Sequence, residues 1–532
     1  MNLDAGLTSL DPAYARSRSP IWMTAQIFNG LVRLDSNLIV RPAVAKSWDL
    51  SDDGKTYTFH LRQGIKYHHH PVFFDQYQYA DSSRELVAQD FVYSLSRILD
   101  PEVASTGKWV FNGKIEGIEA YKNGESENIS GFRAIDDTTF QIRLLKPFPP
   151  FLGLLSMPYC YAIPHEIAEH YGRDFQRNPI GTGPFQFYRW KEGQSLILHR
   201  NPNYWEQDVL GQSLPYLDAV KVRFIPSRLS AFIEFVHGKL DFIGDLDDSY
   251  RDEVLERDGT IKAAYAEKYQ FLFSPQLNTE YLGIQTDPKL DITQDHPLMD
   301  VKIRKALNYA IDRPKLVRFL LNGMGYPAES GFMPKGLPAF DPVAVQGYTY
   351  DPLRARELLQ EAGYPNGKGL EQIVLYSTQK YAAISEFIQK SFEQIGVRTE
   401  IQNLDGGTLR SDRDGLRINF WRASWIADYP DGENYLSLYW SGNFSPDGPN
   451  TSHFASAEYD ALYEASLKQT TDSLRYLLYH EMERLMLAQA PIIPLYYDRS
   501  FRMLQANVSG LGTNPMNYLS LMYVKKEKIS DN

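Results

Sequence analysis

The sequence predicts an α/β protein built from several domains. At 532 residues the chain is too long for one hydrophobic core, so two or three domains are expected. Its second half alternates amphipathic helical stretches with short apolar stretches, which is the pattern of an α/β domain with a mixed or parallel sheet. Its first third instead carries strand-like alternation bounded by turn signals. Hydrophobic and charged contents of 43% and 23% are ordinary for globular domains.

The first third predicts two strands with a helix between them. Residues 56–61 and 139–144 alternate apolar and polar side chains, and each run follows an acidic turn signal. Residues 88–99 have helical spacing and stop at Asp100-Pro101. The proline-rich segment 146–164 cannot be one regular element, so it predicts an extended crossing at a domain edge.

The middle of the chain predicts further strands and then helices. Pro184 opens a strand within NPIGTGPFQFYRW (residues 178–190), and residues 220–224 form another. Asp300 caps a helix whose apolar stripe runs to Ala310, and Pro314 starts a second helix that ends at Asn322-Gly323.

The remaining elements complete the α/β pattern. A helix starts at Asp351-Pro352 and ends at Gly363, consistent with the preference for Pro at helix starts and Gly at helix ends. Residues 373–376 and 397–401 predict strands, with a helix between them that ends at Gly396. A long helix around residues 474–485 precedes a strand at 491–497, which is expected to leave this domain.

Composition excludes several classes of partner. The chain has 55 Lys and Arg against 66 Asp and Glu, a net charge of −11. This argues against nucleic acid, because binding depends on cations that displace counterions from phosphates, and it disfavours a polybasic membrane surface. No run of about 20 apolar residues is present to span a bilayer.

Cysteine usage and the N-terminus leave the compartment open. Cys160 is the only cysteine, so intrachain disulfides and thiolate metal cages are excluded, and its apolar flanks predict a buried, inert thiol. The start MNLDAGLTSLDP has no basic region and no apolar core of a signal peptide. We expect either a cytosolic protein or one whose targeting segment has been removed.

Catalytic motifs are missing from the sequence. It contains no GxSxG elbow, no HExxH and no glycine-rich phosphate loop. His68-His69-His70 is the one dense histidine cluster, but consecutive residues cannot all converge on one ion and Pro71 follows at once. The cluster therefore predicts a solvated loop. We expect no catalytic residue, no metal and no cofactor.

The segment 421–440 is the strongest candidate site. It holds six aromatic residues and is interrupted by Pro430 and Gly432, which predicts a loop or irregular crossing that forms a ligand wall. Asp428 would remain ionised among these rings only with a cation or hydrogen bonds. Two alternatives stay open from the residues alone: a cation from outside, or a turn cap or ion pair with an internal residue such as Arg422. Asp431, beside a glycine, predicts a turn residue.

Several motifs in order resemble one known family. They are IFNGLVRLD (27–35), RPAVAKSWDLSDDGKTYTFHLRQGIKYH (41–68), NPIGTGPFQF (178–187), VKIRKALNYAIDRPKLV (301–317) and DYPDGENYL (428–436). Together they resemble the extracellular solute-binding proteins of the dipeptide, oligopeptide and nickel class, family 5, which feed ATP-driven (ABC) importers. The resemblance covers nearly the whole chain.

The resemblance implies a three-domain fold of the periplasmic binding protein type (class II, cluster C), with two lobes and a hinge. Domain II would comprise residues 35–177 and domain III residues 271–490. Domain I would be assembled from the remaining three segments, residues 1–34, 178–270 and 491–532.

The resemblance also implies a ligand and its anchor. In peptide-binding members an Asp in a W-x-x-D motif meets the α-ammonium of the ligand, and Trp425 and Asp428 match that motif. Trp421 and Tyr429, from the same segment, are expected to line the site with them. Hinge closure would enclose the peptide between the lobes.

The implied partners are a peptide and the permease subunits of an importer. We expect a monomer that acts in the periplasm or outside the cell, anchored to the membrane, after a leader has been removed. Two alternatives remain: the same fold with a nickel chelate, haem or an oligosaccharide as solute, and, from another class, a hydrolase.

Overall fold

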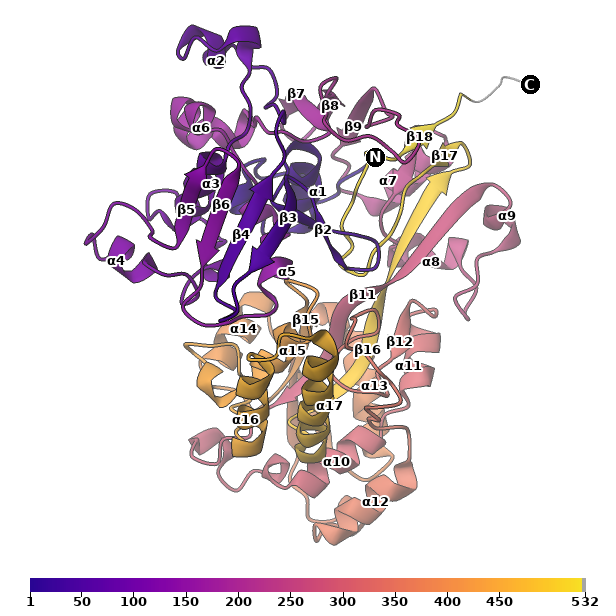
Figure 1. Ribbon diagram of the computed structural model, residues 1–532. Helices are drawn as coiled ribbons and strands as arrows, with labels where there is room; N and C mark the ends of the chain where they lie inside the picture. Colours follow the sequence, from indigo (N-terminus) through magenta and orange to yellow (C-terminus); the bar gives the residue numbers. More distant parts are fainter. Residues whose placement is uncertain (529–532) are drawn as a thin grey trace. The chain divides into compact units, whose positions relative to one another are not determined.

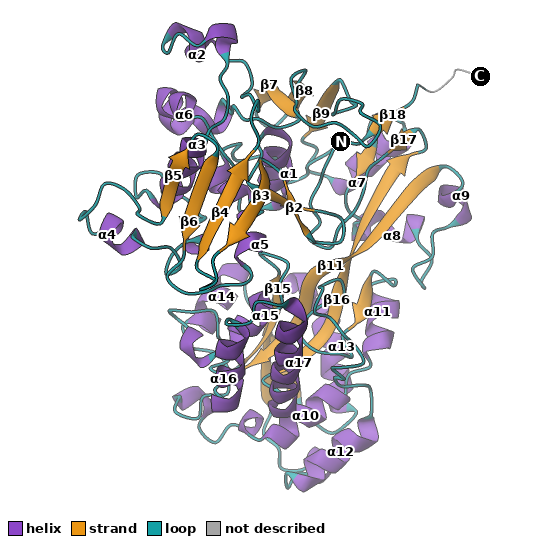
Figure 2. Cartoon of the chain, viewed as in Figure 1, coloured by secondary structure: helices purple, strands orange, loops and turns teal. Residues whose placement is uncertain are grey.

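The computed structural model describes residues 1–528, which form two compact units. Unit 1 comprises Met1–Glu253, Ala263–Phe273 and the segment from Phe501. Unit 2 comprises Val254–Lys262 and Ser274–Ser500. Figures 1 and 2 show the mixture of helices and strands that the sequence predicts. The three-domain boundaries expected from the family resemblance stay a prediction.

Unit 1 contains a four-stranded antiparallel sheet in the order β3-β4-β6-β5. Its strands are β3 (Ala45–Leu50), β4 (Thr56–Leu61), β5 (Phe132–Asp136) and β6 (Thr139–Arg143). Tyr57, Phe59 and Leu61 of β4 are at most 3% exposed, because alternate side chains point to the same, covered face. Helix α3 (Ala88–Leu99) packs against β5 and β6, so both predicted strands and the helix between them are confirmed.

The rest of unit 1 surrounds a three-stranded antiparallel sheet in the order β7-β8-β9 and two small ribbons. The strands are β7 (Phe185–Lys191), β8 (Ser195–Arg200), β9 (Ala219–Arg223), β1 (Val32–Leu34), β2 (Val40–Pro42), β17 (Val508–Ser509), β18 (Lys525–Lys526) and the short β10 (Phe242–Ile243). The helices are α1 (Arg18–Ile27), α2 (Pro71–Asp75), α4 (Ile118–Lys122), α5 (Phe151–Leu155), α6 (His165–Tyr171), α7 (Arg228–Val236), α8 (Asp248–Val254) and α9 (Ala263–Ala266).

The histidine cluster is not a solvated loop throughout, so that prediction is wrong for His68. His68 is 2% exposed, and its Nε2 lies 2.9 Å from the carbonyl oxygen of Gly183. Burial lowers the pKa of His68 to about 4, so the ring is neutral at physiological pH. His70 caps α2 by accepting a hydrogen bond from the Val72 amide, and only His69 is exposed.

The predicted strand after NPIGTGP is confirmed as β7, and the two glycines before it have a packing reason. A Cβ on Gly181 or Gly183 would lie 2.2 Å or 2.4 Å from backbone atoms of Ile27. The Gly183 amide donates to the Ile27 carbonyl oxygen at 2.8 Å. The end of α1 therefore rests directly on the glycine backbone.

The proline-rich segment 146–164 is not extended throughout, which corrects a second prediction. Pro150 precedes α5, since a proline is compatible with a helix start. Cys160 lies just after this helix and is 0% exposed, and burial raises the pKa of its thiol. The prediction of a buried thiol is confirmed.

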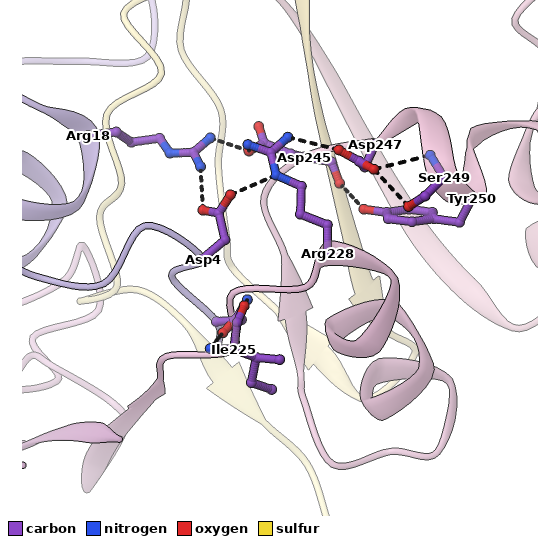
Figure 3. A network of polar contacts seen from close by, with 9 residues as sticks. Asp4, Arg18, Ile225, Arg228, Asp245, Asp247, Ser249 and Tyr250 are labelled. Carbon is purple, nitrogen blue, oxygen red and sulfur yellow. Dashed lines mark hydrogen bonds and ion pairs between the residues drawn. The ribbon is translucent and has the colours of Figure 1, made fainter. Parts of the chain in front are cut away.

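An ion-pair network fixes the N-terminal segment of unit 1 (Figure 3). Arg228 pairs with Asp4 at 2.6 Å and with Asp247 at 3.3 Å. Arg18, at the start of α1, pairs with Asp4 and Asp245. The network joins the N-terminal segment to the start of α7 and to the loop before α8.

Most of unit 2 is built on a mixed sheet whose strand order is β10-β16-β11-β15-β13-β14, with β12 beside β16; β10 itself and one end of β11 and of β16 belong to unit 1. The strands are β11 (Tyr269–Ile284), β12 (Gly325–Pro327), β13 (Ile373–Ser377), β14 (Thr399–Asn403), β15 (Phe420–Ile426) and β16 (Ile492–Gln505). β13 runs parallel to β14 and β15, whereas β11 and β15 are antiparallel. The predicted mixed sheet is confirmed.

Helices cover this sheet and enclose its core. They are α10 (Val301–Tyr309), α11 (Arg313–Leu320), α12 (Pro352–Glu361), α13 (Ala382–Glu393), α14 (Gly406–Asp414), α15 (Glu433–Leu436), α16 (Ala457–Ser466) and α17 (Asp472–Gln489). The predicted caps are confirmed at Asp300 and Asp351, whose side chains accept the amides of Lys302 and Arg354. Residues of α10, α12, α13 and the strands share one apolar cluster.

Two strands continue from one unit into the other. β11 passes from unit 1 to unit 2 after Phe273, and β16 passes back after Ser500. The second passage follows the strand expected at 491–497. Among residues 1–528, no helix combines the length and apolar character that crossing a bilayer requires.

Candidate functional site

The candidate segment begins as a strand, not as the predicted loop. β15 covers Phe420–Ile426 and pairs with β11, with Trp425 opposite Thr279 and Trp421 opposite Gly283. Trp421, Ala423 and Trp425 alternate with Arg422 and Ser424, which is the period of a strand. Pro430 and Gly432, which suggest a loop, lie beyond Ile426 and so do not interrupt the strand.

Asn434 fixes the position of Asp428. Directly after β15, the Ala427 amide donates to the Leu277 carbonyl oxygen at 2.9 Å. The Oδ1 of Asn434 then accepts the Asp428 amide at 3.1 Å and the Trp425 indole N–H at 2.9 Å. The Asn434 side-chain amide donates to Asp428 Oδ2 at 3.4 Å. One buried side chain, 4% exposed, thus orients both residues of the W-x-x-D motif.

The carboxylate of Asp428 has no cationic partner among residues 1–528. Burial raises the pKa of Asp428, and the hydrogen bond from Asn434 opposes that rise only in part. Arg422, the internal partner considered from the sequence, pairs with Glu280 instead. The alternative in which Arg422 neutralises Asp428 is therefore not realised.

Asp431 has the opposite surroundings. It forms the predicted turn, since its Oδ1 accepts the Glu433 amide at 2.9 Å. The same carboxylate also accepts the Tyr479 hydroxyl at 2.8 Å and pairs with Arg475 at 2.8 Å. Asp431 is thus neutralised within unit 2, whereas Asp428 is not.

The other two predicted ligand residues are buried in unit 2. Trp421 is 1% exposed, and Tyr429 is 6% exposed with its hydroxyl bonded to Glu433. Trp425 and Asp428 keep some accessible surface. The ligand roles of all four residues stay predictions.

Sequence reasoning missed a second polar cluster beside this segment. Asn278 and Glu280 on β11, Arg422 on β15 and Asp498 on β16 are joined by hydrogen bonds and an ion pair. The available signal was two buried polar side chains, Asn278 and Glu280, at alternate positions of β11. No group of three or more His, Cys, Asp or Glu in the described part of the chain is placed to hold a metal.

Known proteins similar to this chain bind different solutes. Haem-binding protein A of Haemophilus influenzae is 29% identical, over 93% of this chain and 85% of its own. The dipeptide-binding protein DppE of Bacillus subtilis is 26% identical, over 98% and 90%. The solved structure of the periplasmic murein tripeptide binding protein MppA, in its unliganded open form, has a TM-score of 0.81 at 25% identity and covers 100% of this chain and 97% of that one.

Family membership follows from a match over most of the chain. Residues 40–447 match the family model described as bacterial extracellular solute-binding proteins, family 5, middle region. The match includes the W-x-x-D segment and both strands that frame it. The TM-score of 0.81 supports the same fold, confirming the periplasmic-binding-protein-like class expected from the sequence. The chain is therefore a member of the bacterial extracellular solute-binding proteins of family 5.

Proposed function

We propose that this protein binds short peptides and delivers them to the membrane permease of an ABC importer. One observation carries the proposal: Asp428 is largely buried, is oriented by Asn434, and has no cation paired with it among residues 1–528. An ionised carboxylate in such surroundings is stabilised by an arriving cation. The α-ammonium of a peptide supplies that charge.

The proposed mechanism is closure around the peptide. The Asp428–ammonium pair would fix which end of the peptide lies where, since both ions lose hydration and the net free energy of pairing is modest. Hydrogen bonds to the peptide backbone, of the kind that add a strand to a sheet, would supply most of the affinity. We propose β11 and β16 as the hinge, with the peptide favouring the closed state by binding residues of both units.

Three other solutes and one enzyme activity compete with this proposal. Haem is favoured by the relative named for haem binding. Haem carries propionate carboxylates, however, and a negatively charged solute would be repelled by an uncompensated Asp428. A nickel chelate or an oligosaccharide offers no ammonium for it. Recovery of bound peptides uncleaved after incubation with a peptide mixture would distinguish the receptor from a hydrolase.

The Asp428→Asn variant tests the anchor. It keeps the size of the side chain and removes its charge, so affinity for a peptide with a free N-terminus is expected to fall by roughly ten-fold or more. The native protein is expected to bind the N-acetylated form of the same peptide correspondingly weakly. Calorimetry with both peptides and both proteins gives the four dissociation constants that the comparison needs.

The control is Asp447→Asn, which removes an exposed acid of the same unit. It should leave both affinities within about two-fold. Equal binding of the free and the acetylated peptide by the native protein would exclude Asp428 as the anchor. Preferential binding of haem by the native protein, with no binding of any peptide, would replace the proposed substrate class.

A further inference from the structure

A second acidic group lies in unit 2 on the three neighbouring strands β16, β11 and β15. The side-chain amide of Asn278 donates to Glu280 at 3.2 Å and to Asp498 at 2.6 Å. Arg422 forms an ion pair with Glu280 from the adjacent strand, and its guanidinium stacks on the ring of Tyr381 at 3.3 Å from the centroid. Arg422 therefore contacts Glu280 and acts on Asp498 only through its charge.

Asn278 is left with an unused acceptor that points to a missing donor. It is 3% exposed, and its Oδ1 has no hydrogen-bond partner in the described part of the chain. The side chain cannot be turned around, since both carboxylates need its N–H groups. A buried carbonyl oxygen without a donor is costly, and an ammonium can donate to it and to the carboxylates together.

The charges around the group do not balance it. With Glu280 and Asp498 ionised, the group carries one net negative charge against Arg422. Lys380 is exposed and acts on Asp498 only at a distance, its ammonium lying 5.5 Å from the centroid of the Tyr381 ring. Arg499 follows Asp498 on β16, so its side chain leaves the opposite face of the strand.

Burial shifts the pKa of both acids in the same direction. It raises the pKa of Glu280, and the nearby charge of Asp498 raises it further, to about 7. Burial also raises the pKa of Asp498, which is half-buried and so the more accessible of the two. A cation that arrived here would favour the ionised forms and displace a proton.

This group lies close to Asp428 along the same pair of strands. Asn278 is directly opposite Ile426, and Asp428 comes two residues later, about 7 Å along an extended chain. Asp428 and Asp498 both raise the pKa of the buried Tyr435 hydroxyl, after the larger effect of burial. A peptide held at Asp428 by its N-terminus would thus have its first side chains within reach of the group.

We propose that Asn278, Glu280 and Asp498 form a subsite for a basic side chain, so that peptides with lysine, arginine or ornithine among their first three residues are preferred. This rests on the proposed peptide-binding function and adds a substrate class to it. Arg422 is a positioning residue here: it holds Glu280 in place and is not available to a ligand carboxylate.

The test compares tri-alanine peptides in which lysine or its uncharged counterpart norleucine replaces each position in turn. We expect the native protein to bind the lysine peptide at least ten-fold more tightly at one of the three positions. Calorimetry in two buffers of different ionisation enthalpy should show more proton release for that peptide than for its norleucine partner.

Asp498→Asn and Glu280→Gln should each reduce the lysine preference, measured as the ratio of norleucine to lysine dissociation constants, to about three-fold or less. Asp447→Asn is the matched control and should keep the full preference. Should either variant fail to fold by circular dichroism, the affinity ratios and proton release of the native protein still decide.

The possible results distinguish failure of the subsite from failure of the peptide-binding function. Binding of norleucine peptides with no lysine preference at any position would overturn the subsite and leave the peptide receptor intact. A preference unchanged in both folded variants would also overturn it. Failure of the native protein to bind any of the peptides would overturn the peptide function and the subsite with it.

Discussion

Asp428 and Asp431 lie three residues apart, but unit 2 supplies a cationic partner only to Asp431 among the described residues. Asp431 is paired with Arg475 and accepts two further hydrogen bonds. The Asp428 carboxylate instead accepts a hydrogen bond from the side-chain amide of Asn434, and the Asp428 backbone amide donates to the Oδ1 of the same residue. A buried acid that is held in place but not neutralised lowers the stability of the free protein, as we expect if Asp428 belongs to the proposed binding site.

This difference gives opposite stability effects for the same substitution. Asp431→Asn should lower the free energy of unfolding by about 3 kcal/mol, because Arg475 loses a buried partner. Asp428→Asn should leave it unchanged or raise it slightly, since a neutral amide is easier to bury than a carboxylate. Urea unfolding of both variants checks this. Equal destabilisation by the two substitutions would mean that Asp428 has a structural partner.

Glu483 predicts a pH-dependent stability of unit 2. It is 2% exposed, and its Oε1 accepts the amides of Phe332 at 2.6 Å and Met333 at 2.8 Å. Burial raises its pKa from 4.5 to about 7. The folded protein therefore keeps this proton to higher pH than the unfolded chain, and the free energy of unfolding falls as pH rises from about 4.5 to about 7.

The Glu483→Gln variant should lose this pH dependence, which amounts to roughly 3 kcal/mol of unfolding free energy between pH 4.5 and about pH 7. Urea unfolding at pH 5 and pH 8 measures it. Glu464→Gln, at an exposed acid of α16, is the control and should keep the native profile. Parallel profiles for the native protein and the Glu483 variant would show that Glu483 titrates normally.

At the scale of elements, the sequence predicts the helices and strands whose limits are set by residues next to them in the chain. α3 has the predicted limits because its apolar stripe ends where Asp100-Pro101 stops a helix. β15 differs from the predicted loop because Pro430 and Gly432, which indicate a loop, lie beyond its last residue, Ile426. α5 was missed because a helix of five residues leaves too short a pattern to recognise.

For the candidate site, too, the sequence predicts only what lies within one short segment. Trp425 and Asp428 lie in one short motif, so the sequence alone suffices to propose them, and their ligand role stays a prediction. Asn278 and Asp498, 220 residues apart, meet only because β11 and β16 are neighbours in the sheet. No local pattern contains that strand order, so the cluster could not be predicted. His68 was misassigned for a similar reason, since Gly183 buries it from a distant segment.

The contact between α1 and the glycine segment before β7 can be tested by one methyl group. Gly183→Ala would place a Cβ about 2.4 Å from the Ile27 backbone, and overpacking of this kind costs about 1–3 kcal/mol. We expect a lower thermal unfolding midpoint. Gly512→Ala, where the added Cβ meets nothing within 4 Å, is the matched control. Similar midpoints for the two variants would show that α1 can shift at no cost.

At the scale of the whole molecule, the proposed hinge makes a prediction about size in solution. If β11 and β16 allow the units to close on a peptide, saturating ligand should reduce the radius of gyration measured by small-angle scattering. Asp428→Asn should need a higher peptide concentration for the same change. An unchanged scattering curve at saturation would exclude closure as the response to peptide.

The route of β16 also constrains how the protein is made. Near its end, Met503 and Leu504 pair with Ile243 and Phe242 of β10, and β17 and β18 follow it. A ribosome-bound or truncated chain that stops before residue 501 holds the segments of unit 2 but lacks the final strands of unit 1. Unit 2 can therefore fold before these residues are made, and the edge of β10 that pairs with Met503 and Leu504 stays unpaired until they are.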